Sequence, residues 1–278
     1  MQVRPLSGAL GAEITDINLK TMDEAGFAAL RQVFLDRSVI VVRDQDLSGD
    51  DHIAFAKRWG KININRFFKP TDTHPEIATV LKEADQRHNI GGAWHTDHSY
   101  DQEPAMGSIL YAIETPIAGG DTLFCSMNAA YEGLSPGMQT MLRGLKARHS
   151  SRHAFGATQA GNESHKDGRL GNEAAAKQDA LHPVVIAHPE TGRPALYTNS
   201  DFTLGFEGWT DEESKPLLDQ IEAHSTTPEY TCRVAWEPGT LTMWDNRAVM
   251  HKAINDYHGH RRLMHRITIE GCALSAYG

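Results

Sequence analysis

Two segments of the chain carry residues that together could bind a metal ion. Residues 93–98 read Ala-Trp-His-Thr-Asp-His, and residues 244–251 read Trp-Asp-Asn-Arg-Ala-Val-Met-His. His95, Asp97 and His251 would supply two imidazoles and one carboxylate, which is the ligand set of non-haem Fe(II) oxygenases. Such a set leaves coordination positions open for oxygen chemistry. The three residues therefore predict an open metal site.

Local geometry supports this hypothesis, because an HxD pair alone is a common pattern. Residues i and i+2 of an extended segment project to the same face, so His95 and Asp97 can reach one ion. His251 follows an expected strand and a tight turn, which makes it a suitable third ligand. His98 would point away from Asp97 in an extended chain, and we leave it out of the metal site. The alternative is an ordinary surface histidine beside an acid.

A C-terminal strand adds an independent signal. Arg262, Met264 and Arg266 fall on one of its faces by period-two alternation. Two arginines on one face of a core-like strand are costly unless they meet anions, and guanidinium groups bind carboxylates through paired hydrogen bonds. We therefore expect up to two anionic groups near the metal. The alternative is a surface strand with solvated arginines, as we expect for the neighbouring Arg261.

The elements that must position these residues are mainly strands. Periodicity predicts helices at residues 23–36, after Ser48, at 126–145 with a break at Ser135-Pro136, and at 211–224. It predicts strands at residues 38–42, 78–81, 107–113, 121–124, 184–187, 195–198, 230–236, 240–244 and 263–270, after an N-terminal hairpin at 8–19. This pattern favours a sandwich or open barrel with helices packed outside. We interpret residues 1–278 as a single oxygenase domain.

The stretch from about residue 150 to 180 differs from the rest of the chain. It is polar, weakly periodic and rich in Gly, Asn and His. Long irregular stretches in compact domains are usually functional lids or disordered segments. We therefore expect an irregular active-site lid here.

Bulk composition excludes several classes of protein. The chain has 278 residues, 40% of them hydrophobic, and a formal net charge of -9. An acidic chain is a poor nucleic-acid binder, and no apolar run of about 18 residues suggests a membrane span. The three cysteines form no CxxC pair, and we expect isolated buried thiols in a cytoplasmic protein. We also expect a homo-oligomer, a dimer or a tetramer.

Several motifs in a fixed order resemble one family, the taurine dioxygenase / 2,4-dichlorophenoxyacetate dioxygenase family of Fe(II)- and 2-oxoglutarate-dependent oxygenases. They lie at residues 5–8 (PLSG), 10–14 (LGAEI), 94–97 (WHTD), 119–124 (GGDTLF), 181–185 (LHPVV), 244–247 (WDNR) and 261–266 (RRLMHR). The resemblance implies a mainly β fold with flanking helices and a double-stranded β-helix, a jelly-roll-like core. It implies iron at the mouth of that core, with 2-oxoglutarate and O2 as co-substrates.

The resemblance also implies roles for single residues. His95, Asp97 and His251 match the catalytic iron ligands. Thr122 and Arg262 match the positions that hold the far carboxylate of 2-oxoglutarate. Arg266 matches the position that binds the anionic group of the primary substrate. Phe155 and Phe202 match the aromatic positions of the substrate pocket.

The substrate pocket departs from that of the taurine enzyme. Asn65 stands where that enzyme has a histidine that hydrogen-bonds the sulfonate. Phe68 replaces a tyrosine of the pocket, and Gly91 replaces an asparagine. These differences argue against taurine as substrate. Residues 52–55, 213–218 and 231–234 look more like the aryloxyalkanoate branch of the family.

We therefore expect hydroxylation of a small anionic substrate, an aryloxyalkanoate, a sulfonate or a sulfate ester, which gives succinate and CO2. Hydroxylation beside a heteroatom would fragment the product. A carboxylate at Asp97 occupies the site that a halide would need, which favours hydroxylation over halogenation. Two other functions stay open on these residues: a zinc hydrolase built on the same triad, and a non-catalytic protein that binds a small anion.

Overall fold

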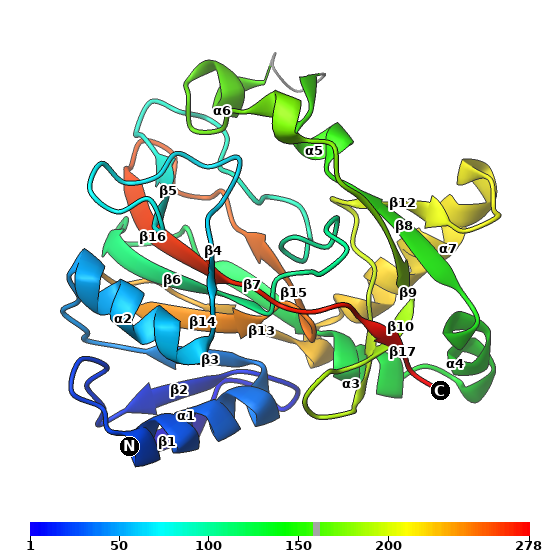
Figure 1. Ribbon diagram of the computed structural model, residues 1–278, viewed down its shortest axis with the longest axis horizontal. Helices are drawn as coiled ribbons and strands as arrows, with labels where there is room; N and C mark the ends of the chain where they lie inside the picture. Colours follow the sequence, from blue (N-terminus) through cyan, green and yellow to red (C-terminus); the bar gives the residue numbers. More distant parts are fainter. Residues whose placement is uncertain (158–161) are drawn as a thin grey trace.

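A large mixed sheet forms the centre of the computed structural model, which describes residues 1–157 and 162–278 (Figure 1). Its strand order is β1-β2-β3-β14-β6-β16-β4. Strand β5 pairs with residues 262–266 of β16, and β4 pairs with residues 268 and 269. The strands are β1 (Gln2–Pro5), β2 (Ala12–Thr15), β3 (Val39–Val42), β4 (Ile62–Asn63), β5 (Ala78–Lys82), β6 (Gly107–Glu114), β14 (Leu241–Asp245) and β16 (Arg262–Ile269). The pairing of β2 with β3 is parallel, and the other described pairs of this sheet are antiparallel.

A smaller sheet faces the large one. It has the order β13-β7-β15, with β7 (Thr122–Ser126) between β13 (Thr231–Val234) and β15 (Val249–Ala253). A shared core fills the space between the sheets, where Leu110 and Phe124 pack in one cluster. The two facing layers, both mainly antiparallel, agree with the predicted sandwich.

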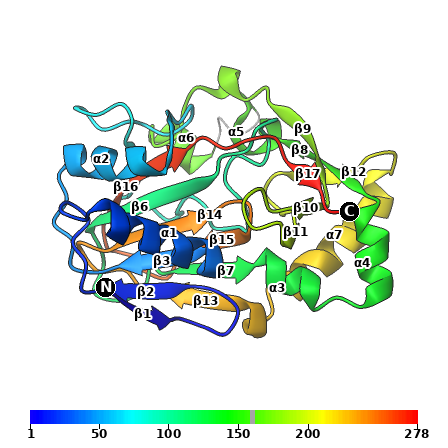
Figure 2. The same cartoon turned by 60° about the horizontal axis from the view of Figure 1, so that its bottom comes forward.

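Two helices cover the outer face of the large sheet (Figure 2). They are α1 (Glu24–Arg37), capped by Asp23, and α2 (Gly49–Trp59), which begins with a capping box at Ser48. Along β6, Ile109 packs against these helices while the next residue, Leu110, faces the small sheet. This period-two alternation makes one face of each central strand available to the site.

The rest of the molecule packs beside this sandwich. It contains two sheets of the order β12-β8-β9 and β11-β10-β17 and the helices α3, α4 and α7. Their bounds are β8 (Lys146–Ser150), β9 (Asp179–Pro183), β10 (Val185–Ala187), β11 (Pro194–Leu196), β12 (Thr203–Phe206), β17 (Ser275–Ala276), α3 (Met127–Glu132), α4 (Pro136–Arg143) and α7 (Asp211–Ser225). The predicted helix break at Ser135-Pro136 is confirmed, since Ser135 caps α4 and proline follows it.

Three expectations need correction. The segment 150–180 is not wholly irregular, because it contains the short turns α5 (Arg152–Phe155), α6 (Glu163–Lys166) and η2 (Glu173–Ala175). Residues 158–161 of the expected lid lie outside the described residues. The N-terminal hairpin joins β1 to β2 and so begins earlier than predicted. Cys125 and Cys232 are buried free thiols, whereas Cys272 is exposed because it follows the last core strand.

A membrane span was not expected, and the described ranges contain no helix that is long and apolar enough for one.

Candidate active site

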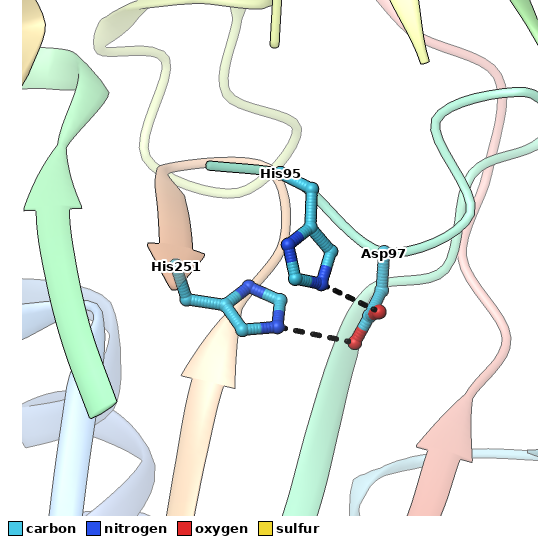
Figure 3. Close-up of side chains that lie close together, drawn as sticks. All are labelled: His95, Asp97 and His251. Atoms are coloured by element: carbon cyan, nitrogen blue, oxygen red, sulfur yellow. Dashed lines mark ion pairs between the residues drawn. The ribbon is translucent and has the colours of Figure 1, made fainter. Parts of the chain in front are cut away.

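Backbone pairing brings the two metal-binding segments together. The amide of His95 donates to the carbonyl of His251 at 3.0 Å, and the amide of His251 donates back at 2.8 Å. Asp97 lies two residues beyond His95, and its carboxylate faces both rings (Figure 3). Its oxygens lie 3.8 Å from Nε2 of His95 and 3.9 Å from Nε2 of His251. The predicted triad is therefore assembled and buried, with one donor atom from each residue within 4.8 Å of the others.

The protonation states of these residues suit a divalent cation. Nδ1 of His95 donates to the carbonyl of Ala93 at 2.9 Å, which leaves Nε2 facing Asp97. Burial, with His95 beside it, holds the pKa of His251 well below its ordinary value. Burial by itself would raise the pKa of Asp97, but the Arg266 guanidinium beside it lowers it below the ordinary range. Neutral imidazoles and an ionised carboxylate are what a metal ion requires, so the donor set fits one.

Asp97 is also held by groups outside the triad. Oγ of Ser108 donates to Oδ2 at 2.7 Å, and Nη1 of Arg266 donates to Oδ1 at 3.2 Å. The same guanidinium lies 4.3 Å from the centre of the Phe68 ring. Arg266 therefore bridges the metal-binding carboxylate and an aromatic wall.

Arg262 meets a different environment on the same face of β16. Arg262 is 5% exposed, and its guanidinium lies 5.6 Å from the centre of the Trp236 ring. Nε1 of Trp236 in turn donates to Oγ1 of Thr122 at 3.0 Å. Within residues 1–157 and 162–278, Arg262 forms no ion pair, and its Nε has no hydrogen-bond partner. Burial lowers the pKa of Arg262, as is expected for a cation that lacks an anion.

One cavity of about 410 Å³ joins these groups. It is lined by every residue predicted for the site: His95, Asp97, His251, Thr122, Arg262, Arg266, Asn65, Phe155 and Phe202. The predicted alternation of Arg262 and Arg266 is thereby confirmed. Phe202 lies 4.9 Å from Tyr100 and 5.9 Å from Phe155, measured between ring centres. The cavity thus combines the predicted metal-binding triad, two cations and an aromatic wall.

The structure gives a physical reason for the glycine at position 91. Gly91 has a φ of +80°, and a Cβ built on it would lie 3.1 Å from Cε1 of His95. Its carbonyl accepts the amide of Ala253 on β15. A side chain here would press on His95, a predicted metal ligand, so glycine relieves both the backbone strain and the crowding.

One residue of the cavity was misjudged from the sequence. His98 was expected to face away from Asp97, but its φ of +61° ends the extended segment and the residue lines the cavity. It does not join the triad within the described residues. Nothing in a hydrophobic pattern predicts a left-handed histidine, so only its position beside the HxD motif could have drawn attention to it.

The family can now be stated. The model of the taurine catabolism dioxygenase TauD, TfdA family matches residues 2–268. The chain belongs to this family. It is a 2-oxoglutarate-dependent dioxygenase, an oxidoreductase, and family membership implies 2-oxoglutarate as co-substrate together with a metal ion.

Relatives and solved structures agree along nearly the whole chain. An alkylsulfatase of Acinetobacter baylyi is 31% identical over 98% of this chain and 85% of its own. An α-ketoglutarate-dependent 2,4-dichlorophenoxyacetate dioxygenase of a Burkholderia strain is 32% identical over 98% of this chain and 92% of its own. The crystal structure of a taurine dioxygenase from Burkholderia xenovorans matches with a TM-score of 0.83 and 31% identity, over 99% and 92% of the two chains. The predicted double-stranded β-helix core is confirmed by this likeness.

Proposed function

We propose that the enzyme is Fe(II)-dependent and uses O2 to hydroxylate a small anionic organic substrate, while 2-oxoglutarate is converted to succinate and CO2. The observation that carries this proposal is the shared cavity. It places the triad beside two buried arginines, one of which lacks any carboxylate partner in the described residues. Family membership speaks against the two other functions, a zinc hydrolase and a non-catalytic anion binder.

The triad residues would hold Fe(II), and bound iron would supply the activation of O2. Arg262 would form paired hydrogen bonds with the far carboxylate of 2-oxoglutarate. Since Oγ1 of Thr122 accepts from Trp236, its own O–H remains available to donate to the same carboxylate. Both residues act by fixing the co-substrate in one orientation before reaction.

Arg266 would bind the anionic group of the primary substrate, and the apolar body of the substrate would contact Phe68, Phe155 and Phe202. The relatives support a sulfate ester, a sulfonate or an aryloxyalkanoate, because their names specify such substrates. Hydroxylation beside the heteroatom of such a compound gives an unstable adduct. We therefore also propose that the product fragments to an aldehyde or keto acid.

The segment at about 150–180 would act as a lid over the substrate. Phe155 stacks on Phe67 at 4.3 Å, and the Glu163 carboxylate accepts the amides of Arg87 and His88, each at 3.0 Å. Arg169 adds hydrogen bonds to the carbonyls of Leu81 and His88, and these contacts would have to break and re-form when substrate enters. A closed lid would exclude water from the reacting groups.

We further propose that residues 1–278 act as a single oxygenase domain in a cytoplasmic homo-dimer or tetramer. The three free thiols are compatible with a reducing compartment. Light scattering after size-exclusion chromatography would test the oligomeric state.

A substrate panel scored by succinate formation tests the proposed reaction. Iron-loaded protein with 2-oxoglutarate should release succinate rapidly with at least one alkyl sulfate, sulfonate or aryloxyalkanoate, and slowly without substrate. Product analysis should then find the matching aldehyde or keto acid. Absence of substrate-stimulated succinate across the whole panel would reject the proposed substrate class.

A further inference from the structure

Ser108 places a polar side chain among the buried residues of β6. The residue is 0% exposed, and the next two residues of the strand, Ile109 and Leu110, belong to the apolar cores on its two faces. Period-two alternation puts Ser108 on the same face as Leu110, which lines the cavity. A buried hydroxyl is costly unless it forms hydrogen bonds. The contacts of this side chain should therefore explain why a serine stands here.

The hydroxyl of Ser108 forms hydrogen bonds with both segments that supply the triad. Its Oγ donates to Oδ2 of Asp97, in the segment 93–98, at 2.7 Å. It accepts from Nδ2 of Asn246, in the segment 244–251, at 3.5 Å, which is a long hydrogen bond. A hydroxyl has one proton to donate, and this one is directed at the Asp97 carboxylate. One buried side chain thus joins the two segments that form the metal site.

The backbone around Ser108 is closely packed. Gly107 pairs with Asp245, and a Cβ built on Gly107 would lie 2.7 Å from the carbonyl oxygen of Trp244. Ser108 itself pairs with Trp244 on β14 and with Thr268 on β16, so its strand has neighbours on both sides. Side chains on such paired strands are held more precisely than side chains on loops. The donor to Asp97 is therefore fixed in position by the sheet.

Asp97 has a second partner outside the triad, but that partner has another role. Nη1 of Arg266 donates to Oδ1 of Asp97 at 3.2 Å, and the proposed function assigns Arg266 to the substrate anion. Ser108 is not among the described residues that line the cavity, so its hydroxyl is not needed for substrate. Ser108 can therefore keep Asp97 in place while Arg266 binds the substrate.

We propose that Ser108 is a positioning residue of the metal site, whose hydroxyl holds the Asp97 carboxylate towards the imidazoles of His95 and His251 (Figure 3). This inference rests on the proposed function, in which the triad binds Fe(II). A group that hydrogen-bonds a metal ligand orients that ligand, and its removal typically lowers metal affinity roughly 10- to 100-fold. Ser108 supplies neither a metal ligand nor a contact with substrate, and it acts through Asp97.

Metal binding measured without turnover tests this role. In Ser108→Ala the dissociation constant for Mn(II) should rise roughly 10- to 100-fold, because the carboxylate loses its buried donor. Ser108→Thr and Ser108→Val are nearly equal in shape, and only threonine keeps the donor. The threonine variant should bind Mn(II) at least roughly tenfold more tightly than the valine variant. This second comparison is valid even if the alanine variant fails to fold.

Thr242→Val is the matched control for loss of a buried hydroxyl. Thr242 is 0% exposed on the neighbouring strand β14, and its Oγ1 has no hydrogen-bond partner within the described residues. This variant should bind Mn(II) within about twofold of wild type, a smaller change than one hydrogen bond contributes.

The visible absorption spectrum of the Co(II)-loaded protein gives a second readout, because it reports the geometry of the ligands. The spectrum should change in Ser108→Ala and Ser108→Val. It should keep the wild-type form in Ser108→Thr and Thr242→Val. A role of Ser108 in folding alone would leave the spectrum of the folded variants unchanged.

Wild-type affinity for Mn(II) in Ser108→Ala and Ser108→Val would overturn the inference, and so would equal affinities of the threonine and valine variants. If instead the wild type does not bind Mn(II), or if Asp97→Ala binds it as tightly as the wild type, the proposed function itself fails. The two failures are therefore distinguishable.

Discussion

Arg262 and Arg266 project from the same face of β16 into one cavity, yet they meet opposite surroundings. Arg266 already contacts a carboxylate, Asp97, at 3.2 Å. Arg262 is equally buried and lies against the Trp236 ring, but it forms no ion pair within the described residues. A buried cation without an anion is costly, whereas a paired one is compensated. The difference indicates that Arg262 is free to pair with an anion from solution. Arg266 would have to bind the substrate anion while it also contacts Asp97.

This comparison predicts an order of events. A metal ion bound by Asp97 would take over part of the charge that Arg266 now compensates. Arg266 would then be freer to bind the substrate anion. Metal loading should therefore strengthen binding of the substrate anion at Arg266.

The largest effect is expected for Asp97→Ala. It removes both a metal ligand and the partner of Arg266, so substrate-dependent consumption of 2-oxoglutarate should fall at least roughly a thousandfold, as for groups that act as a unit. Turnover assays with saturating Fe(II) measure this. A normal rate in this variant would show that the triad is not the catalytic centre.

Arg266→Leu should lower stability as well as substrate affinity. It leaves the buried Asp97 carboxylate without its cation, which costs about 3 kcal/mol in metal-free protein. Urea unfolding in the presence of a chelator measures the loss, and Mn(II) should restore part of it. Arg261→Leu is the matched control, because Arg261 is a part-exposed arginine paired with Glu83 and Glu114 and should change stability by less than about 1 kcal/mol.

Arg262→Leu should have the contrasting profile. Loss of a charged hydrogen-bond donor should raise the KM for 2-oxoglutarate by roughly 10- to 150-fold. Stability should be unchanged or increased, because an unpaired buried charge is removed. If this variant unfolds as easily as Arg266→Leu, the two arginines do not differ in the way described.

A smaller effect concerns stability at acid pH, and it distinguishes a histidine of the core from the histidines of the cavity. Burial lowers the pKa of His52, on the buried side of helix α2, to about 3. Below pH 6.5 the His52 imidazole is protonated in the unfolded chain, but in the folded chain it stays neutral down to about pH 3. Protonation therefore favours the unfolded chain as the pH falls from about 6.5 towards 3. The free energy of unfolding should drop by about 2 kcal/mol at pH 5 on account of His52. In His52→Phe, the loss of stability between pH 7 and pH 5 should be smaller by about 2 kcal/mol, with or without metal.

Urea unfolding of His52→Phe at pH 7 and pH 5 checks this, with the exposed His258→Asn as control. An undiminished slope in His52→Phe would assign the acid sensitivity to other groups, the cavity histidines included.

What the sequence could predict was local. The i, i+2 spacing of His95 and Asp97 and the alternation of Arg262 and Arg266 follow from strand geometry and appear as expected. Strand β8 was missed because its buried positions include the polar His149 and Ser150, which hide the hydrophobic alternation.

Long-range partners could not be read from one chain. The contact of Arg266 with Asp97 joins residues 169 positions apart. The turn at His98 depends on Asp101 and Arg66, whose side chains compensate a backbone conformation that no pattern specifies. Such features depend on packing and not on propensity.

The most direct test of the account is simultaneous recording of O2 uptake and succinate release with an accepted substrate. The Fe(II)-loaded enzyme should consume one O2 for each succinate formed, and replacing Fe(II) by Zn(II) should stop both. Substrate turnover by the Zn(II) form without O2 uptake would contradict the central claim that this cavity is an iron and 2-oxoglutarate oxygenase site.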